Sequence, residues 1–111
     1  MGVAATYIMD NIMHSDNGKE GHKSLNRYQI MKVQTPQAFD YHLIMELHER
    51  AIEENCIGAW DNSSMITNLG EKVYFSEGSD LNIKINTVED VEMFKALYKM
   101  KIIEEKEKRW N

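Results

Sequence analysis

The sequence has 111 residues, of which 42% are hydrophobic and 28% charged, which is ordinary for one globular domain and excludes a disordered or fibrous chain. Its formal net charge is −5 and its lysines and arginines are scattered, so neither nucleic acid nor an anionic membrane is expected as a partner. A chain this small buries only about 60 to 70% of its unfolded surface, so help from a partner subunit would be no surprise.

The single cysteine and the first thirteen residues bear on the cellular compartment. Cys56 has no second cysteine to pair with, and residues 1–13 have neither the basic start nor the apolar run of a signal peptide. A cytoplasmic location is therefore expected. Cys56 follows a helical pattern with no basic partner nearby, which favours a small core residue over a nucleophile.

The first predicted elements are a short strand at residues 7–9 and a hairpin-like excursion after it. Ser15-Asp16-Asn17-Gly18 contains an Asn-Gly pair, which tolerates positive φ in a tight reversal. The return limb is predicted over residues 25–33. Because an isolated hairpin is only marginally stable in water, residues 10–27 are predicted to form a β-arm that packs against something else.

Residues 39–55 predict an amphipathic helix, because apolar side chains recur at helical spacing and glutamates occupy the other face. Asp40 is its predicted N-cap, and Asn55 its predicted end. A helical turn over residues 63–69 follows, closed by Gly70.

Two further strands are predicted, one at residues 73–75 and one around Ile83 and Ile85. Thr87 then caps a last helix, with Asp90 in the place of the Glu or Gln of a capping box. Its predicted buried stripe consists of four apolar residues: Val91, Phe94, Leu97 and Tyr98.

The alternation of strand and helix predicts an α/β fold with helices on a mainly parallel sheet. Two or three short strands do not complete a doubly wound sheet, so residues 1–111 are expected to form a single partial domain of that kind. Residues 104–111 alternate in charge, which is typical of a solvated tail.

Arg27 and Thr35 are candidates for holding a phosphomonoester. The planar guanidinium of Arg27 matches phosphate oxygens, and the Thr35 hydroxyl precedes Pro36, which stiffens its turn. The alternative is a surface arginine and an ordinary turn residue.

Asp61 and Lys84 each have two readings. Asp61 precedes a Ser-Ser helix start, so it is either an N-cap or a ligand for the hydroxyls of a polyol. Lys84 alternates with two isoleucines, so it is either an exposed strand lysine or a fixed cation that neutralises phosphoryl groups during transfer.

The four histidines predict no metal site. His42 and His48 are six residues apart, on different sides of a helix, while His14 and His22 lie in the expected arm.

Several motifs occur together in a fixed order. Gln34-Thr35-Pro36-Gln37-Ala38-Phe39 is preceded by Arg27 and followed by the Asp61 segment, then by Gly78-Ser79, Asn82-Ile83-Lys84-Ile85 and Thr87-Val88-Glu89-Asp90. This arrangement, over roughly residues 3–101, resembles the 2-C-methyl-D-erythritol 4-phosphate and ribitol-5-phosphate cytidylyltransferases.

The resemblance implies the C-terminal part of a Rossmann-like nucleotidyltransferase sheet, with flanking helices and a protruding β-arm. It implies transfer of CMP from CTP to a sugar-alcohol phosphate with release of pyrophosphate, the Mg2+ being bound with CTP. It also implies a homodimer in which the arm reaches into the neighbouring subunit. No residue decides between ribitol 5-phosphate and methylerythritol phosphate, although Leu81-Asn82-Ile83-Lys84 and Phe94-Lys95-Ala96-Leu97 look slightly more like the ribitol-type enzymes.

Residue by residue, the resemblance implies that Arg27 and Thr35 hold the acceptor phosphate and that Asp61 lies beside the acceptor hydroxyls. Lys84 would reach the phosphoryl groups, so Lys84 and Arg27 are the expected catalytic residues. Asn11 is an expected acceptor-binding position, but the family usually has a threonine there, and Trp60 stands where a threonine usually precedes the aspartate.

The glycine-rich loop that cradles the CTP phosphates in the family has no counterpart in residues 1–111. We therefore expect this chain to carry the acceptor side of a cytidylyltransferase site, as a split subunit or as a fragment of a longer gene. The alternative is a truncated, catalytically inactive relative that serves only as a folded or dimerising module.

Overall fold

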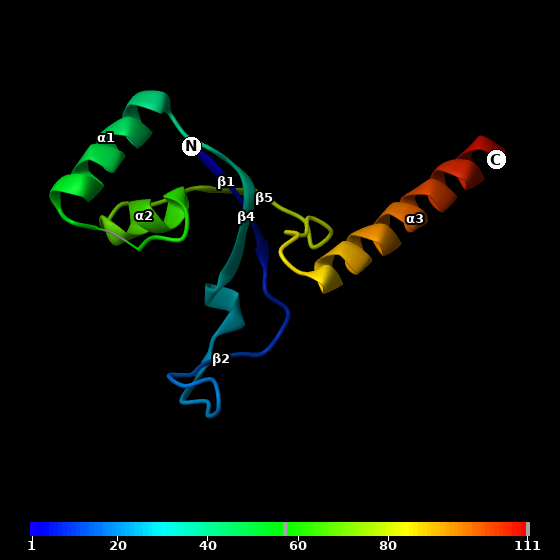
Figure 1. Ribbon diagram of the computed structural model, residues 1–111, viewed down its shortest axis with the longest axis horizontal. Helices are drawn as coiled ribbons and strands as arrows, with labels where there is room; N and C mark the ends of the chain where they lie inside the picture. The colour runs from blue at the N-terminus through cyan, green and yellow to red at the C-terminus, as the bar shows by residue number, and fades with distance from the viewer. Residues whose placement is uncertain (57, 111) are drawn as a thin grey trace. The chain divides into compact units, whose positions relative to one another are not determined.

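The computed structural model describes residues 1–56 and 58–110, and the chain divides into two compact units, Met1–Gly78 and Ser79–Asn111 (Figure 1). The fold is α/β, as predicted. The elements, in chain order, are β1 (Gly2–Tyr7), β2 (Ile12–His14), β3 (Lys23–Leu25), the 3-10 helix η1 (Arg27–Gln29), β4 (Met31–Ala38), α1 (Tyr41–Glu53), α2 (Asn62–Asn68), β5 (Phe75–Glu77) and α3 (Val88–Trp110).

The first unit contains a three-stranded sheet in the order β4-β1-β5. β1 pairs antiparallel with β4 and parallel with β5, so the prediction of a mainly parallel sheet was wrong. The connections give the reason: β4 returns directly after the hairpin excursion, whereas β5 follows the α1–α2 crossover, which a parallel pair needs.

The strand predicted at residues 7–9 is displaced, because β1 ends at Tyr7. Val3, Ala4 and Ala5 are all buried, so the strand is covered on both faces and lacks the alternation that reveals a half-buried strand.

β4 carries an irregularity where it passes β1. Val3 pairs with Gln37 and Ala5 with Val33, so a two-residue step on β1 faces a four-residue step on β4. The extra residues lie in Gln34-Thr35-Pro36. A bulge suits this segment, since Pro36 has no N–H to give to the ladder.

The hairpin between β1 and β4 is formed by β2 and β3, which pair antiparallel from Ile12 opposite Leu25 to His14 opposite Lys23. The reversal predicted at Asn17-Gly18 is confirmed: Gly18 has φ 73°, and the Asn17 side chain accepts from the Lys19 and Glu20 N–H groups. The return limb is not one continuous strand, because η1 interrupts it.

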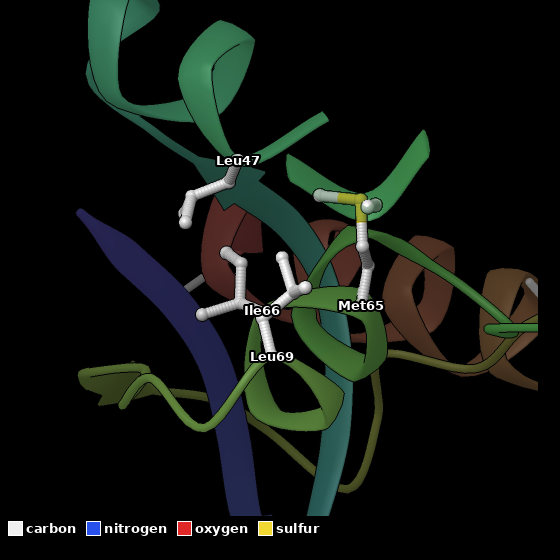
Figure 2. Packing of buried hydrophobic residues seen from close by; sticks show 5 residues of the cluster. Leu47, Met65, Ile66 and Leu69 are labelled. Atoms are coloured by element: carbon white, nitrogen blue, oxygen red, sulfur yellow. The ribbon is translucent and has the colours of Figure 1, made fainter. Parts of the chain in front are cut away.

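Helices α1 and α2 enclose the hydrophobic core of the first unit. Five buried side chains form it, and Figure 2 shows four of them converging between the two helices: Leu47, Met65, Ile66 and Leu69, with Ala51 as the fifth. Cys56 packs against this cluster, as its sequence setting predicts.

The ends of both helices agree with the sequence. Asp40 caps α1 by accepting from the Leu43 N–H at 3.0 Å, and Asn55 lies just past the end of α1 with φ 53°. Gly70 has φ 83° just past the end of α2.

The second unit begins with a turn, in which the Asn82 N–H donates to the Ser79 carbonyl oxygen, and continues through an irregular segment to α3. Residues 82–86 form no strand, so the strand predicted around Ile83 and Ile85 was wrong. Among the residues that the structure describes, no strand pairs with this segment. The cap predicted at Thr87 is confirmed: Thr87 Oγ1 accepts from the Asp90 N–H at 3.1 Å, and Asp90 Oδ2 accepts from the Thr87 N–H at 3.0 Å.

The stripe predicted to be buried on α3 is exposed. Val91, Phe94 and Tyr98 are 38%, 50% and 58% exposed, and only Leu97 is half-buried. Helical spacing identifies an apolar face correctly but not what covers it. The charged residues 104–109 continue the helix and are exposed.

Candidate functional site

Asp61 lies at the N-terminus of α2, where its carboxylate is the helix cap. Oδ1 accepts from the Ser64 N–H at 2.8 Å, and the Ser63 hydroxyl donates to Oδ1 and Oδ2 at 2.9 and 3.0 Å. The N-cap reading of Asp61 is therefore confirmed. Capping does not exclude a second role, since Asp61 is still exposed to solvent.

These contacts keep Asp61 ionised. Burial raises the pKa of Asp61, but hydrogen bonds from Gln37, Ser64 and Ser63 outweigh it and lower the pKa from its ordinary 3.8 to about 2. At neutral pH the carboxylate is an acceptor only, which is the form that receives hydrogen bonds from hydroxyl groups.

Gln37 connects this carboxylate to the sheet. Its Nε2 donates to Asp61 Oδ2 at 2.8 Å and lies 3.3 Å from the Gln34 carbonyl oxygen. The sequence assigned no role to Gln37, although it lies in the quoted Gln34–Phe39 motif. Its partner is 24 residues away, so spacing gave no signal.

Thr35 lies in the irregular stretch of β4, two residues before Gln37, and is exposed. The Thr35–Pro36 peptide bond is cis. Bulges often occur beside functional sites, where they redirect a side chain. Thr35 and Asp61 thus belong to neighbouring parts of one unit, joined by the Gln37 side chain.

Arg27 lies in η1, at the base of the hairpin. Its Nη1 donates to the Met9 carbonyl oxygen at 3.0 Å, and its guanidinium carbon lies 5.5 Å from the centroid of the Tyr28 ring. One of five N–H donors therefore fastens the two limbs of the hairpin together. Arg27 as a whole is exposed.

Asn11 and Trp60, the two departures from the family pattern, are both exposed. Asn11 directly precedes β2, and Trp60 directly precedes Asp61. Trp60 is 96% exposed, so the indole leaves the carboxylate uncovered.

Lys84 belongs to the second unit, in the irregular segment before α3, and is exposed. The structure thus links Asp61, through Gln37, to the strand of Thr35, while Arg27 lies in the same unit at the base of the hairpin and Lys84 belongs to the other unit. The rigid strand expected to carry Lys84 is not formed.

Among the described residues, no group of three or more His, Cys, Asp or Glu side chains is arranged to hold a metal ion. In the same part of the chain, no helix is long and apolar enough to cross a membrane.

The fold is α/β and of the nucleotidyltransferase-like kind. Residues 1–100 match the model of the IspD family, 2-C-methyl-D-erythritol 4-phosphate cytidylyltransferase. The chain belongs to this family.

Two curated relatives carry the two acceptor names. A 2-C-methyl-D-erythritol 4-phosphate cytidylyltransferase of Clostridium beijerinckii is 43% identical over 82 residues, covering 74% of this chain and 36% of the relative. A ribitol-5-phosphate cytidylyltransferase of Lacticaseibacillus paracasei is 35% identical over 95 residues, covering 83% of this chain and 40% of the relative. The chain thus spans about two fifths of the length of these relatives.

Two solved structures of cytidylyltransferases are similar in fold to this chain. The 2-C-methyl-D-erythritol 4-phosphate cytidylyltransferase of Thermus thermophilus superposes with a TM-score of 0.72 at 28% identity, covering 86% of this chain and 46% of that one. The 4-diphosphocytidyl-2C-methyl-D-erythritol synthase of Anaerococcus prevotii gives 0.75 at 29% identity, covering 88% and 44%.

Proposed function

We propose that this chain supplies the acceptor side of a cytidylyltransferase site, at which CMP passes from CTP to ribitol 5-phosphate or 2-C-methyl-D-erythritol 4-phosphate and pyrophosphate is released. The observation that carries the proposal is the ionised Asp61, joined through Gln37 to the strand of Thr35, in a chain whose residues 1–100 match the family.

Each site residue has a proposed task. Arg27 and Thr35 hold the acceptor phosphate, whose charge the guanidinium and hydroxyl can meet with hydrogen bonds. Asp61 accepts from the hydroxyls of the polyol, and Asn11 contributes a further polar contact.

The reaction joins two anions, so positive charge is its main requirement. The acceptor phosphate must approach the α-phosphate of CTP in line, and fixed cations offset the repulsion between them. Lys84 is the proposed cation on the phosphoryl groups. Mg2+ accompanies CTP in this proposal and would neutralise charge on the nucleotide phosphates.

Pyrophosphate release tests the proposal. The part of the Clostridium beijerinckii relative outside the matched region is fused to this chain, and the fusion is supplied with CTP, Mg2+ and each acceptor in turn. We expect release that depends on one acceptor and is absent from the relative's part alone. Release no higher than in that control, with a folded fusion, would reject the proposal in favour of a non-catalytic module.

A homodimer formed through the hairpin is a further part of the proposal. The tip between His14 and Lys23 is polar and exposed, so it cannot bury enough surface to offset the entropy of ordering it in a lone subunit. Sedimentation should show association that depends on concentration. If deleting residues 16–22 leaves association unchanged, the hairpin is not the interface.

A cytoplasmic location completes the proposal. The single Cys56, half-buried and packed on the core as a free thiol, suits a reducing compartment.

A further inference from the structure

The side chain of Gln37 connects the end of β4 to the start of α2, where it contacts Asp61. Its Nε2 donates to Asp61 Oδ2 at 2.8 Å, and the backbone of Gln37 is itself paired with Val3 of β1. Val3 is fully buried. The donor is therefore anchored in the central part of the sheet.

Asp61 has little freedom left. Its Oδ1 accepts from the Ser64 N–H and the Ser63 hydroxyl, while its Oδ2 accepts from Gln37 and shares the Ser63 hydroxyl. These contacts, two on each oxygen, fix the orientation of the carboxylate. The residue is nevertheless exposed, so a solvent-facing side of the carboxylate is accessible to a ligand.

We propose that Gln37 is a positioning residue, which orients the carboxylate of Asp61 so that its solvent-exposed side meets a hydroxyl of the polyol phosphate. The inference rests on the proposed function, since it assumes that Asp61 binds the acceptor. Ser63 and Ser64 hold the carboxylate as a helix cap with or without Gln37. Gln37 also links Asp61 to β4, the strand that carries Thr35. In this proposal the link keeps a fixed distance between Asp61, which binds the hydroxyl, and Thr35, which binds the phosphate.

The positioning role predicts a change in KM rather than in kcat. A contact to a hydroxyl that is equally strong before and during transfer contributes to KM and not to kcat. Gln37→Met keeps the length of the side chain and removes the donor. In the active fusion it should raise the acceptor KM about tenfold, the loss expected for one hydrogen bond to a charged group, and leave kcat within about twofold.

A second readout needs no activity. The carboxyl carbon of Asp61 is followed by NMR during a pH titration of the full chain. Gln37→Met should raise the pKa of Asp61 from about 2 toward its ordinary 3.8, because one hydrogen bond to the ionised form is lost. Gln37→Glu, which sets a second carboxylate beside Asp61, should raise it further. Gln29→Met, an exposed glutamine in η1, is the matched control and should change neither readout.

The outcomes separate the two proposals. If the fusion with Gln37 intact releases no pyrophosphate, the proposed function fails, and the inference fails with it. If that fusion is active but Gln37→Met leaves the acceptor KM and the titration of Asp61 unchanged, only the inference is overturned. An active fusion in which Gln37→Met lowers thermal stability and leaves KM alone also overturns it, since Gln37 would then be merely structural.

Discussion

Arg50 of α1 is bound to Glu71, which lies just beyond α2. Its Nη1 lies 3.1 Å from Glu71 Oε1, and its Nη2 donates to the Leu69 carbonyl oxygen at 3.0 Å. The carbonyl belongs to the C-cap of α2, a group that the helix cannot satisfy by itself. The guanidinium therefore fastens together the two helices that enclose the core.

Arg50→Met should lower the free energy of unfolding by about 1 kcal/mol, because it removes both the ion pair and the hydrogen bond to the carbonyl. Glu71→Gln should cost about 0.5 kcal/mol or less, since Glu71 is largely exposed and the pair is screened. Urea unfolding measures both. Equal losses from the two variants would show that the carbonyl contributes nothing.

Ile66 is fully buried at the centre of the core cluster. Ile66→Val should cost about 0.5 to 1.5 kcal/mol, and Ile66→Ala about 2 to 5 kcal/mol, because the cavity grows with each methyl group removed. Ile52→Ala on α1 is the control: Ile52 is 80% exposed, and its loss should stay within about 0.5 kcal/mol. If Ile52→Ala lowered the urea midpoint as much as Ile66→Ala does, Ile66 would not be at the centre of the core.

Asp61 should contribute to stability in a pH-dependent way. Its pKa is lower in the folded chain, about 2, than its ordinary 3.8, so folding favours the ionised form. The contribution is then present above pH 3.8 and is lost as the pH falls through about 2. Asp61→Asn keeps a capping oxygen but cannot ionise, so its stability deficit should shrink over that window. A deficit that stays constant down to pH 2 in thermal melts would contradict the lowered pKa.

Gly78 is required by close packing rather than by an unusual φ. Its N–H donates to the Ala5 carbonyl oxygen at 2.8 Å, and a Cβ at Gly78 would lie 2.8 Å from the same oxygen and would also meet the Gln34 side chain. Gly78→Ala should therefore cost about 1 to 3 kcal/mol, since β1 would have to shift. At Gly2 a Cβ would meet nothing within 4 Å, so Gly2→Ala is the matched control in the same melt experiment. Similar melting temperatures for the two variants would argue against the steric reason.

Lys84 and Arg27 should separate in kinetics. In the active fusion, Lys84→Gln should lower kcat strongly if Lys84 meets charge that develops during transfer, as proposed. Its exposed position should keep the stability change within about 0.5 kcal/mol. Arg27→Gln should mainly raise the acceptor KM. Because Arg27 also holds the Met9 carbonyl, its stability is measured alongside. If Lys84→Gln kept full turnover, Lys84 would be an ordinary exposed lysine without a catalytic role.

The sequence predicted the elements whose causes are local. The amphipathic pattern and Asp40 located α1, and Thr87 with Asp90 located the start of α3, because a cap and its helix lie within a few residues. The reversal at Asn17-Gly18 is local in the same sense. The order of the motifs identified the family.

What the sequence could not supply depends on distant partners. The buried run Val3–Ala5 lacks the alternation of apolar and polar residues that indicates a half-buried strand. It is a strand because β4 and β5 pair with it on either side. Ile83 and Ile85 have strand propensity, but no strand among the described residues pairs with them, and propensity alone forms no strand. The bond between Gln37 and Asp61 spans 24 residues, beyond the reach of any local pattern.

Trp60 makes the region around Asp61 visible to spectroscopy. Its indole is 96% exposed and is the immediate neighbour of the carboxylate, so its fluorescence in the free protein is that of an indole in water. A molecule that settles on Asp61 displaces water from this ring and shifts the emission to shorter wavelength. With Trp110, the other tryptophan of the chain, replaced by phenylalanine, the protein carries its own optical reporter for any ligand that binds beside Asp61, without any added label.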